Sequence, residues 1–242
     1  KKRIIDNAAI KRWQLPTPLL SIGITILTLL IASITVMGPS FVIEKIKAVH
    51  QTIFKPVFGR WNITVAENRQ PDFLEWSQSF GPFFKNIPIF FWLFFIGSVL
   101  MFKKTIGELK KKDVRIITAL FILFLTGVIF SRYSSGSVFN GENFVSKAFY
   151  YLSALIFIGA VIFYYIRYYR NEEKSFENVS FGYILSLCLF ILALFTARGA
   201  VRLIMVLGPI APIFVAFLIA ELTYGFLNTN KRAAKIVWAI AL

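Results

Sequence analysis

Long apolar runs separated by short polar segments dominate this chain. A membrane-spanning helix needs roughly 17 to 25 predominantly apolar residues, and six charge-free windows of about that size occur, with a seventh begun. They are Thr17–Met37, Asn86–Phe102, Ile116–Ser131, Ala148–Ile166, Val179–Ala197 and Leu203–Ala220, followed by Ile236–Leu242. Each window is expected to be helical, because lipid offers backbone polar groups no water. The pattern predicts an all-α, polytopic transmembrane bundle of about six complete helices and the start of a seventh, forming one transmembrane domain over residues 1–242.

Composition narrows the classes further. The chain is 57% hydrophobic and 16% charged, which excludes a water-soluble globule and a disordered chain. One cysteine and one histidine exclude an internal disulfide and a Cys/His zinc site with four protein ligands. Because the chain starts at Lys1 without a methionine and stops within an apolar run, we expect it to be a piece of a longer protein that is inactive by itself.

The distribution of basic residues predicts which way the helices point. With alternating crossings, one side of the membrane receives 17 of the Lys and Arg residues and the other receives 10. The positive-inside tendency assigns the richer side, including the amino terminus, to the cytoplasm. The net charge of +15 is therefore explained by topology, and no motif predicts nucleic-acid binding. We expect a multi-pass protein of the cell membrane.

The longest external connection, residues 38–85, is large enough to contain structure of its own. Apolar residues recur at helical spacing over Phe41–Phe54, which predicts an amphipathic helix on the membrane surface. The segment Thr64-Val65-Ala66-Glu67 follows, and its β-branched residues favour an extended backbone. Such a segment can carry the Glu67 carboxylate to a site, although a solvated loop residue is the simpler interpretation.

Two arginines lie at the outer membrane edge, where two apolar windows meet. If this segment is helical, Arg198 and Arg202 are four residues apart and share a face. Unpaired cations in this setting indicate an anionic partner, and guanidinium groups suit phosphate oxygens. A lipid-linked phosphate or pyrophosphate is the natural candidate. The alternative is that both side chains extend to the lipid headgroups. Gly208-Pro209 and Pro212 are expected to bend the helix that follows.

Together, two segments resemble a known family. Thr64-Val65-Ala66-Glu67, followed by Asn68-Arg69-Gln70-Pro71, is similar to the Thr-Ile-x-Glu motif in the last large external loop of oligosaccharyltransferase catalytic subunits, and its wording resembles archaeal members. Gly199-Ala200-Val201-Arg202-Leu203 resembles the later Gly-x-x-Val-Arg-Leu segment of the same family. The two matches occur in the family's order, and both are assigned to the outside by the charge distribution.

The resemblance implies a function and a site. It implies that the chain is the carboxyl-terminal half of the membrane region of an enzyme of the GT-C architecture, which moves a glycan from a polyprenol (dolichol) carrier to asparagine in N-x-S/T sequons. Glu67 would contact the acceptor amide and lie at a divalent metal site for Mn²⁺ or Mg²⁺, and Arg202 would hold the lipid phosphate or pyrophosphate. Arg198 is added as a second phosphate ligand from helical spacing. The expected partners are lipid-linked oligosaccharide, an acceptor polypeptide and membrane lipid.

One departure from the family and two alternatives accompany this hypothesis. Four apolar windows separate the two motifs, two more than expected for the bacterial form, so the alignment of the middle is open. Another polyprenyl-phosphate-dependent glycosyltransferase of the same architecture would modify lipid or serine and threonine instead. A non-catalytic lipid-phosphate transporter or flippase would use Arg198 and Arg202 without a metal.

Overall fold

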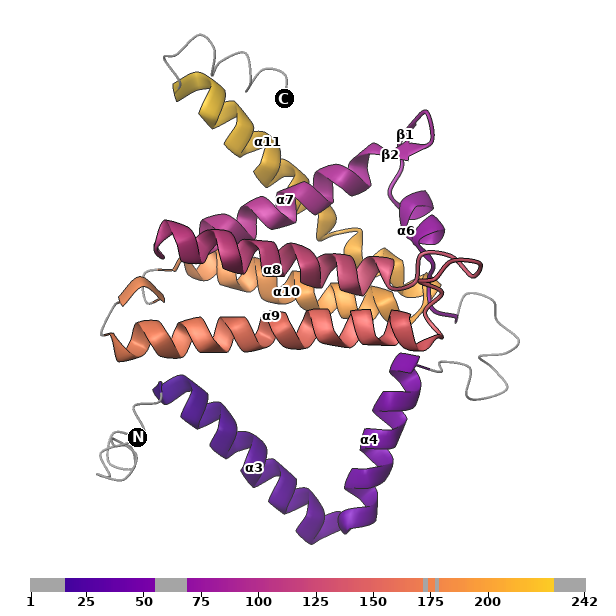
Figure 1. The fold of residues 1–242 in the computed structure, drawn as a ribbon, viewed down its shortest axis with the longest axis vertical. Coiled ribbons are helices and arrows are strands. Elements are labelled where there is room, and N and C mark those ends of the chain that lie inside the picture. The colour runs from indigo at the N-terminus through magenta and orange to yellow at the C-terminus, as the bar shows by residue number, and fades with distance from the viewer. Residues whose placement is uncertain (1–15, 55–68, 172–173, 177–178, 229–242) are drawn as a thin grey trace.

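The computed structural model describes residues 16–54, 69–171, 174–176 and 179–228, with the backbone alone for residues 51–54 and 174 (Figure 1). Glu67 and the apolar run Ile236–Leu242 lie outside the described residues. The prediction for Glu67 therefore has to be considered through the described part of its loop, which resumes at Arg69.

Helices make up roughly four-fifths of the described chain. The α-helices are α3 (Thr17–Met37), α4 (Pro39–Phe54), α6 (Phe73–Ser79), α7 (Ile89–Thr105), α8 (Lys111–Phe130), α9 (Phe144–Arg170), α10 (Phe181–Gly199) and α11 (Ala211–Asn228). Two 3₁₀-helices, η2 (Lys174–Phe176) and η3 (Val201–Leu207), and one hairpin of β1 (Phe83–Phe84) and β2 (Ile87–Pro88) complete the described elements. The predicted all-α class is confirmed at this level, and the short hairpin is an addition that the apolar pattern did not predict.

Five of the described helices are long and apolar enough to cross a membrane: α3, α8, α9, α10 and α11. Helix α7 has 17 residues, close to the lower limit for crossing about 30 Å of hydrocarbon. The described chain thus has the character of a multi-pass membrane protein. The amphipathic segment predicted over Phe41–Phe54 is a helix, α4, and its position on a membrane surface stays a prediction.

The sixth predicted window, Leu203–Ala220, is wrong as a single helix. Its first part forms the 3₁₀-helix η3, and the α-helix α11 begins only at Ala211. Pro209 cannot donate a backbone hydrogen bond, and its ring opposes an α-helix running through it. Gly208 N–H instead donates to the carbonyl of Met205 at 2.9 Å. The helix expected to bend at Gly208-Pro209 is instead interrupted there.

Aromatic rings and glycines pack the bundle. Phe94 stands edge-to-face on Phe190 with ring centroids 5.5 Å apart, and both rings are buried. A Cβ added to Gly97 of α7 would lie 2.2 Å from the backbone oxygen of Phe214 in α11, so these two helices touch along their backbones. Helices in lipid gain little from apolar burial against one another, and close van der Waals packing of this kind holds them together instead.

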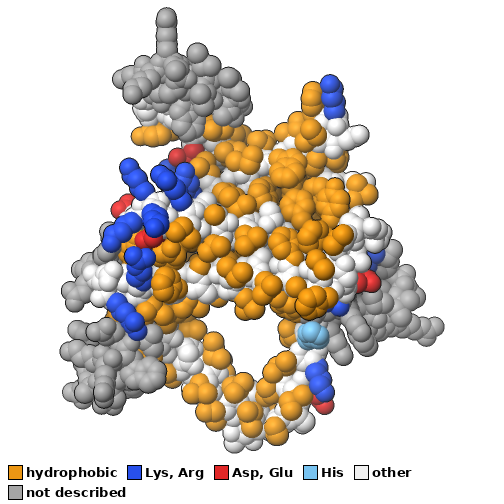
Figure 2. Space-filling model, viewed as in Figure 1, with side chains coloured by type: hydrophobic (Ala, Val, Ile, Leu, Met, Phe, Trp, Pro, Cys, Tyr) orange, Lys and Arg blue, Asp and Glu red, His pale blue; other side chains and the backbone are white. Residues whose placement is uncertain are grey.

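The bundle has two chemically different ends (Figure 2). We call the end where α7 and α9 terminate in Lys103, Lys104, Arg167 and Arg170 the basic end. The opposite end carries α6, the β1–β2 hairpin and the turn of residues 131–143, and we call it the loop end (Figure 1). Among the described segments, 103–115 and 167–170, which are predicted to share one side of the membrane, lie at the basic end, and 69–85 and 132–147, which are predicted to share the other, lie at the loop end (Figure 1). Which end faces the cytoplasm stays a prediction from charge.

Helices α3 and α4 stand apart from the rest as a V (Figure 1). No residue of α3 is buried, although this helix is the most apolar of the candidate spans. Thr25, Thr28 and Thr35 turn their hydroxyl groups inward to the carbonyl four residues earlier on the same helix, which satisfies them in an apolar surrounding. The helix therefore presents a predominantly apolar surface.

Candidate functional site

Arg202 lines a cavity of about 510 Å³ at the loop end. Helix α10 ends at Gly199, and Ala200 is fully extended with φ −157° and ψ 150°. This extended residue turns the chain into η3 and leaves Arg202 exposed. The other lining residues are Ser79, Phe80, Gly81, Phe90, Val201, Ile204, Met205, Gly208, Ala211 and Pro212. Arg202 is therefore the one charged residue among the lining residues of a cavity whose walls are mostly apolar.

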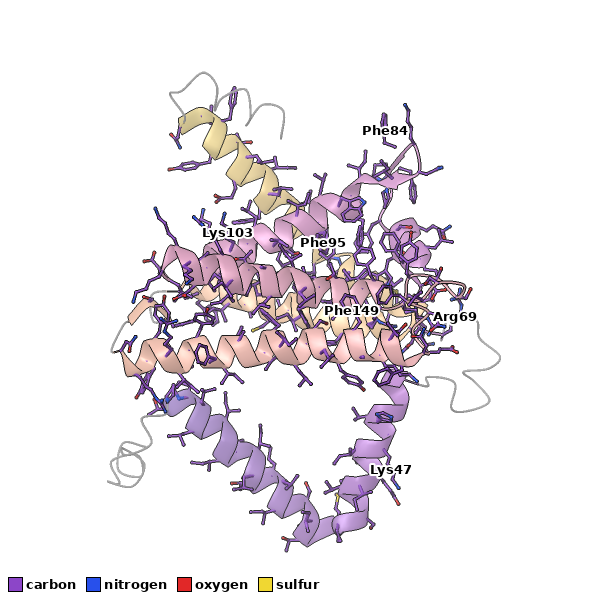
Figure 3. All side chains as sticks on the ribbon, viewed as in Figure 1. Lys47, Arg69, Phe84, Phe95, Lys103 and Phe149 are labelled. Atoms are coloured by element: carbon purple, nitrogen blue, oxygen red, sulfur yellow. The ribbon has the colours of Figure 1, made fainter. Side chains whose placement is uncertain are left out.

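The two segments that carry the family resemblance are joined by a backbone hydrogen bond. Val201 N–H donates to the carbonyl oxygen of Arg69 at 2.9 Å. Val201 directly precedes Arg202, and Arg69 stands two residues after Glu67 in the sequence. Arg69 itself lies at the loop end (Figure 3). The described end of the Glu67 loop is thereby bound to the segment that carries Arg202.

Asp72, Arg132 and the backbone of Phe73 together fix this loop to the bundle. We call these three groups the loop clasp. Arg132 Nε donates to Asp72 Oδ1 at 2.8 Å, and both side chains are about four-fifths buried. Phe73 N–H donates to the carbonyl of Arg132 at 3.0 Å. Gln70, which is buried, accepts a longer contact of 3.4 Å from Arg132 Nη1. The segment from residue 70 to 73 is therefore held by side-chain and backbone contacts to the 131–143 turn.

Local structure explains why Arg132 reaches Asp72. Gly141 has φ +81°, and a Cβ there would lie 2.9 Å from the side-chain carbons of Arg132. Only glycine combines this conformation with so close an approach. On the other side, Glu75 accepts from the N–H of Asp72 at 2.8 Å and pairs with Arg69, which secures the start of α6. The turn at Gly141 therefore positions Arg132, and the start of α6 positions Asp72.

Arg198 does not lie beside Arg202 on a shared helical face. The helix ends between them, so the spacing argument that paired them does not hold. Arg198 is 7% exposed, and its guanidinium lies over the ring of Tyr150 at 5.7 Å. Its Nε and Nη1 are buried without a hydrogen-bond partner in the described residues. The structure therefore separates the two arginines into a buried one and one that lines the cavity.

The described carboxylates do not form a metal centre. Across the described ranges, no three His, Cys, Asp or Glu side chains gather closely enough to hold a metal ion. Asp72 and Glu75 are both engaged by guanidinium groups, which compete with a cation for the same oxygens. The metal prediction rests on Glu67, which lies outside the described residues and is not tested.

Sequence reasoning missed the loop clasp. Asp72 and Arg132 are 60 positions apart, and neither belongs to a recognisable motif. The available signal was that both were predicted on the outer side of the membrane, where basic residues are few. A charge-pairing argument restricted to that side would have offered Asp72 as one of five carboxylate partners for Arg132.

Comparisons with protein-family models, with curated proteins and with solved structures found no match to this chain.

Proposed function

We propose that this chain is part of an oligosaccharyltransferase, which moves a glycan from a polyprenol (dolichol) phosphate or pyrophosphate carrier to asparagine in N-x-S/T sequons of exported proteins. One observation carries the proposal. The hydrogen bond from Val201 to Arg69 joins the two resembling segments beside the cavity that Arg202 lines.

Covalent geometry extends that observation to Glu67. Consecutive Cα atoms are about 3.8 Å apart, so any conformation keeps the Cα of Glu67 within about 7.6 Å of the Cα of Arg69. Glu67 and Arg202 are 135 positions apart in the sequence. In the proposal they serve one two-substrate site, with Glu67 for the acceptor and Arg202 for the carrier.

The cavity chemistry suits a lipid-linked phosphate. Ligand sites commonly occupy about 300 to 1,000 Å³, with mostly apolar walls and few polar groups, and this cavity of about 510 Å³ has that character. The Arg202 guanidinium offers several N–H donors to phosphate oxygens. Phe80, Phe90 and Met205 supply apolar surface for the adjoining polyprenyl chain.

The acceptor side of the reaction explains the need for a carboxylate. An asparagine amide nitrogen is a poor nucleophile, because its lone pair is delocalised into the carbonyl, as in a peptide bond. In the proposed reaction the nitrogen bonds to the anomeric carbon, the bond between that carbon and the carrier phosphate oxygen breaks, and the proton that the nitrogen loses passes to solvent. Glu67 would bind the amide hydrogens and orient the nitrogen. Arg202 would stabilise the negative charge that the departing phosphate gains.

The proposal includes Mn²⁺ or Mg²⁺ only through the resemblance. The described carboxylates at the loop end do not fit a cation, because Asp72 and Glu75 face arginines. We therefore derive no step through a metal. The second predicted phosphate ligand, Arg198, stays a prediction. Arg198 is buried over Tyr150, and only Arg202 of the two lines the cavity. The localisation that accompanies this proposal is the cell membrane, with the loop end on the extracellular face.

The test is glycan transfer by the intact protein in lipid nanodiscs, from a polyprenyl-linked donor to a fluorescent peptide containing Asn-x-Thr. Arg202→Ala and Glu67→Gln are each expected to reduce transfer by about 100-fold or more, the usual result of removing one group that stabilises transition-state charge. Matched controls are Arg170→Ala, an exposed cation at the basic end, and Glu142→Gln, an external carboxylate that is 76% exposed. Both controls should transfer normally.

Each departure from this outcome has a defined meaning. Unchanged transfer in Arg202→Ala and Glu67→Gln removes the proposed roles. Glycan attached to lipid or to serine and threonine, identified by mass spectrometry, points to another polyprenyl-dependent glycosyltransferase. Carrier binding without any transfer, and without dependence on Mn²⁺ or Mg²⁺, points to a transporter or flippase. Arg198→Met in the same assay decides whether the buried arginine contributes.

A further inference from the structure

The β1–β2 hairpin presents its apolar side chains outward. Phe83 is 49% exposed, Phe84 is 60% exposed and Ile87 is 52% exposed. The two strands pair Phe83 with Pro88 and Phe84 with Ile87. Lys85 and Asn86 form the turn, and both have positive φ values of 46° and 69°, as a tight two-residue hairpin turn requires. The tight turn therefore holds Phe83, Phe84 and Ile87 on the surface, away from the core.

The hairpin leaves the bundle sideways. Figure 1 shows it projecting from the loop end, away from α8, α9 and α10 and across their axes rather than along them. Phe84 stands at its tip in Figure 3. Since these helices are candidate membrane spans, a sideways projection at their ends lies at the depth where a bilayer meets water.

The exposed apolar surface of the hairpin continues onto α7. Ile89, Trp92 and Ile96 are 40%, 37% and 51% exposed and lie three to four residues apart, so they share one face of the helix. This face continues from the hairpin along the first half of the helix, as far as Ile96. Aromatic side chains such as Trp92 are enriched where membrane spans meet the headgroups.

We propose that the hairpin is an interfacial anchor that dips into the lipid bilayer at the loop end. Phe83, Phe84 and Ile87 contact the boundary between headgroups and acyl chains, and Lys85 faces lipid phosphate. The Lys85 ammonium already lies 5.8 Å from the ring of Phe84, the amphipathic arrangement that interfacial segments use. This inference stands whether or not the transferase proposal is correct.

The anchor has a consequence for the neighbouring cavity. Phe80 and Gly81, directly before the hairpin, line the cavity together with Arg202. An anchored hairpin fixes this wall at the depth of the lipid headgroups. A lipid-borne phosphate then meets the cavity from within the bilayer plane.

Nitroxide labelling at single cysteines tests the anchor. Cys188 is the sole cysteine of the sequence and is replaced by serine; Phe84→Cys then carries the label. The full chain is reconstituted in nanodiscs of equal parts phosphatidylcholine and phosphatidylglycerol. Two matched controls use exposed positions: Val138→Cys, 66% exposed in the turn at the loop end, and Leu155→Cys, 64% exposed in the interior of α9. Collisions with oxygen, which concentrates in lipid, and with a water-soluble nickel chelate report depth.

An interfacial segment lies about 5–10 Å below the headgroup boundary, so the Phe84 label is expected to collide with nickel several-fold less often than the Val138 label. Its oxygen collisions should lie between those of Val138 and Leu155. Nickel collisions equal to those of Val138 would mean that the hairpin is in water and would overturn the proposal. Low collision rates with both reagents would mean that protein covers the hairpin, which also overturns it. Lys85→Cys provides a second reporter on the turn if Phe84→Cys does not reconstitute.

Discussion

Breaking the loop clasp should loosen the start of α6 and the loop that precedes it. The perturbation is Arg132→Met, which removes the guanidinium but keeps an aliphatic stem beside Gly141. It abolishes the hydrogen bond to Asp72 and the longer contact with Gln70. Asp72→Asn and the double variant complete a mutant cycle, which isolates the interaction between the two side chains from their other effects.

The expected magnitude follows from burial. A hydrogen bond to a charged group contributes about 1.5–3 kcal/mol, and an exposed ion pair only about 0–1 kcal/mol. Arg132 and Asp72 are 16% and 21% exposed, so their pair belongs near the middle of the first range. We expect a coupling of about 2 kcal/mol, which corresponds to a factor of about 30 in an equilibrium constant.

Hydrogen exchange of the segment 69–76 in nanodiscs measures this coupling, because amide exchange follows the free energy of local opening. The Phe73 amide, bonded to the carbonyl of Arg132, is the most direct reporter. Glu75→Gln is the matched control, since it removes the pair with Arg69, which is 47% exposed, while glutamine can still accept from the N–H of Asp72. That control should change exchange by less than about fivefold. Equal exchange in Arg132→Met and Glu75→Gln would refute the clasp.

Two further outcomes test the packing of the bundle by thermal unfolding. Gly97→Ala is expected to lower the free energy of unfolding by about 1–3 kcal/mol, because the new Cβ would lie 2.2 Å from the backbone oxygen of Phe214. Gly159→Ala is the control and should be neutral or stabilising, because nothing lies within 4 Å of that Cβ. Similar unfolding midpoints for the two variants would contradict the close contact. Tyr168→Phe is expected to cost about 1–3 kcal/mol, since its hydroxyl donates to the buried Asp113 at 2.9 Å, and an unchanged midpoint would show that this bond contributes nothing.

The membrane spans could be predicted because their signal is local. A run of apolar residues long enough to cross lipid favours a helix wherever the rest of the chain lies, and the window that failed, Leu203–Ala220, contains Gly208-Pro209 and Pro212. The first and last residues of the helices were harder to predict. Helix α8 starts at Lys111, five residues before its apolar window, because a helix can begin in the charged region outside lipid. The apolar windows therefore underestimate α8 and α9, whereas the window Thr17–Met37 coincides with α3.

The candidate site was only partly predictable. Arg202 was identified by its type and neighbours, and the structure gives it a cavity. The pairing with Arg198 failed because it assumed a continuous helix, and one extended residue, Ala200, removes that periodicity. The Asp72 and Arg132 contact depends on tertiary structure across 60 positions, which neither helical spacing nor hydropathy encodes.

The bond between Val201 and Arg69 uses main-chain atoms alone, so the side chains at both positions can change without touching it. Proline at 201 is the exception, since it lacks the donor hydrogen. Substitutions could therefore accumulate at much of this junction while the two segments stay hydrogen-bonded. Distant relatives would then keep the contact after the two sequence motifs had diverged.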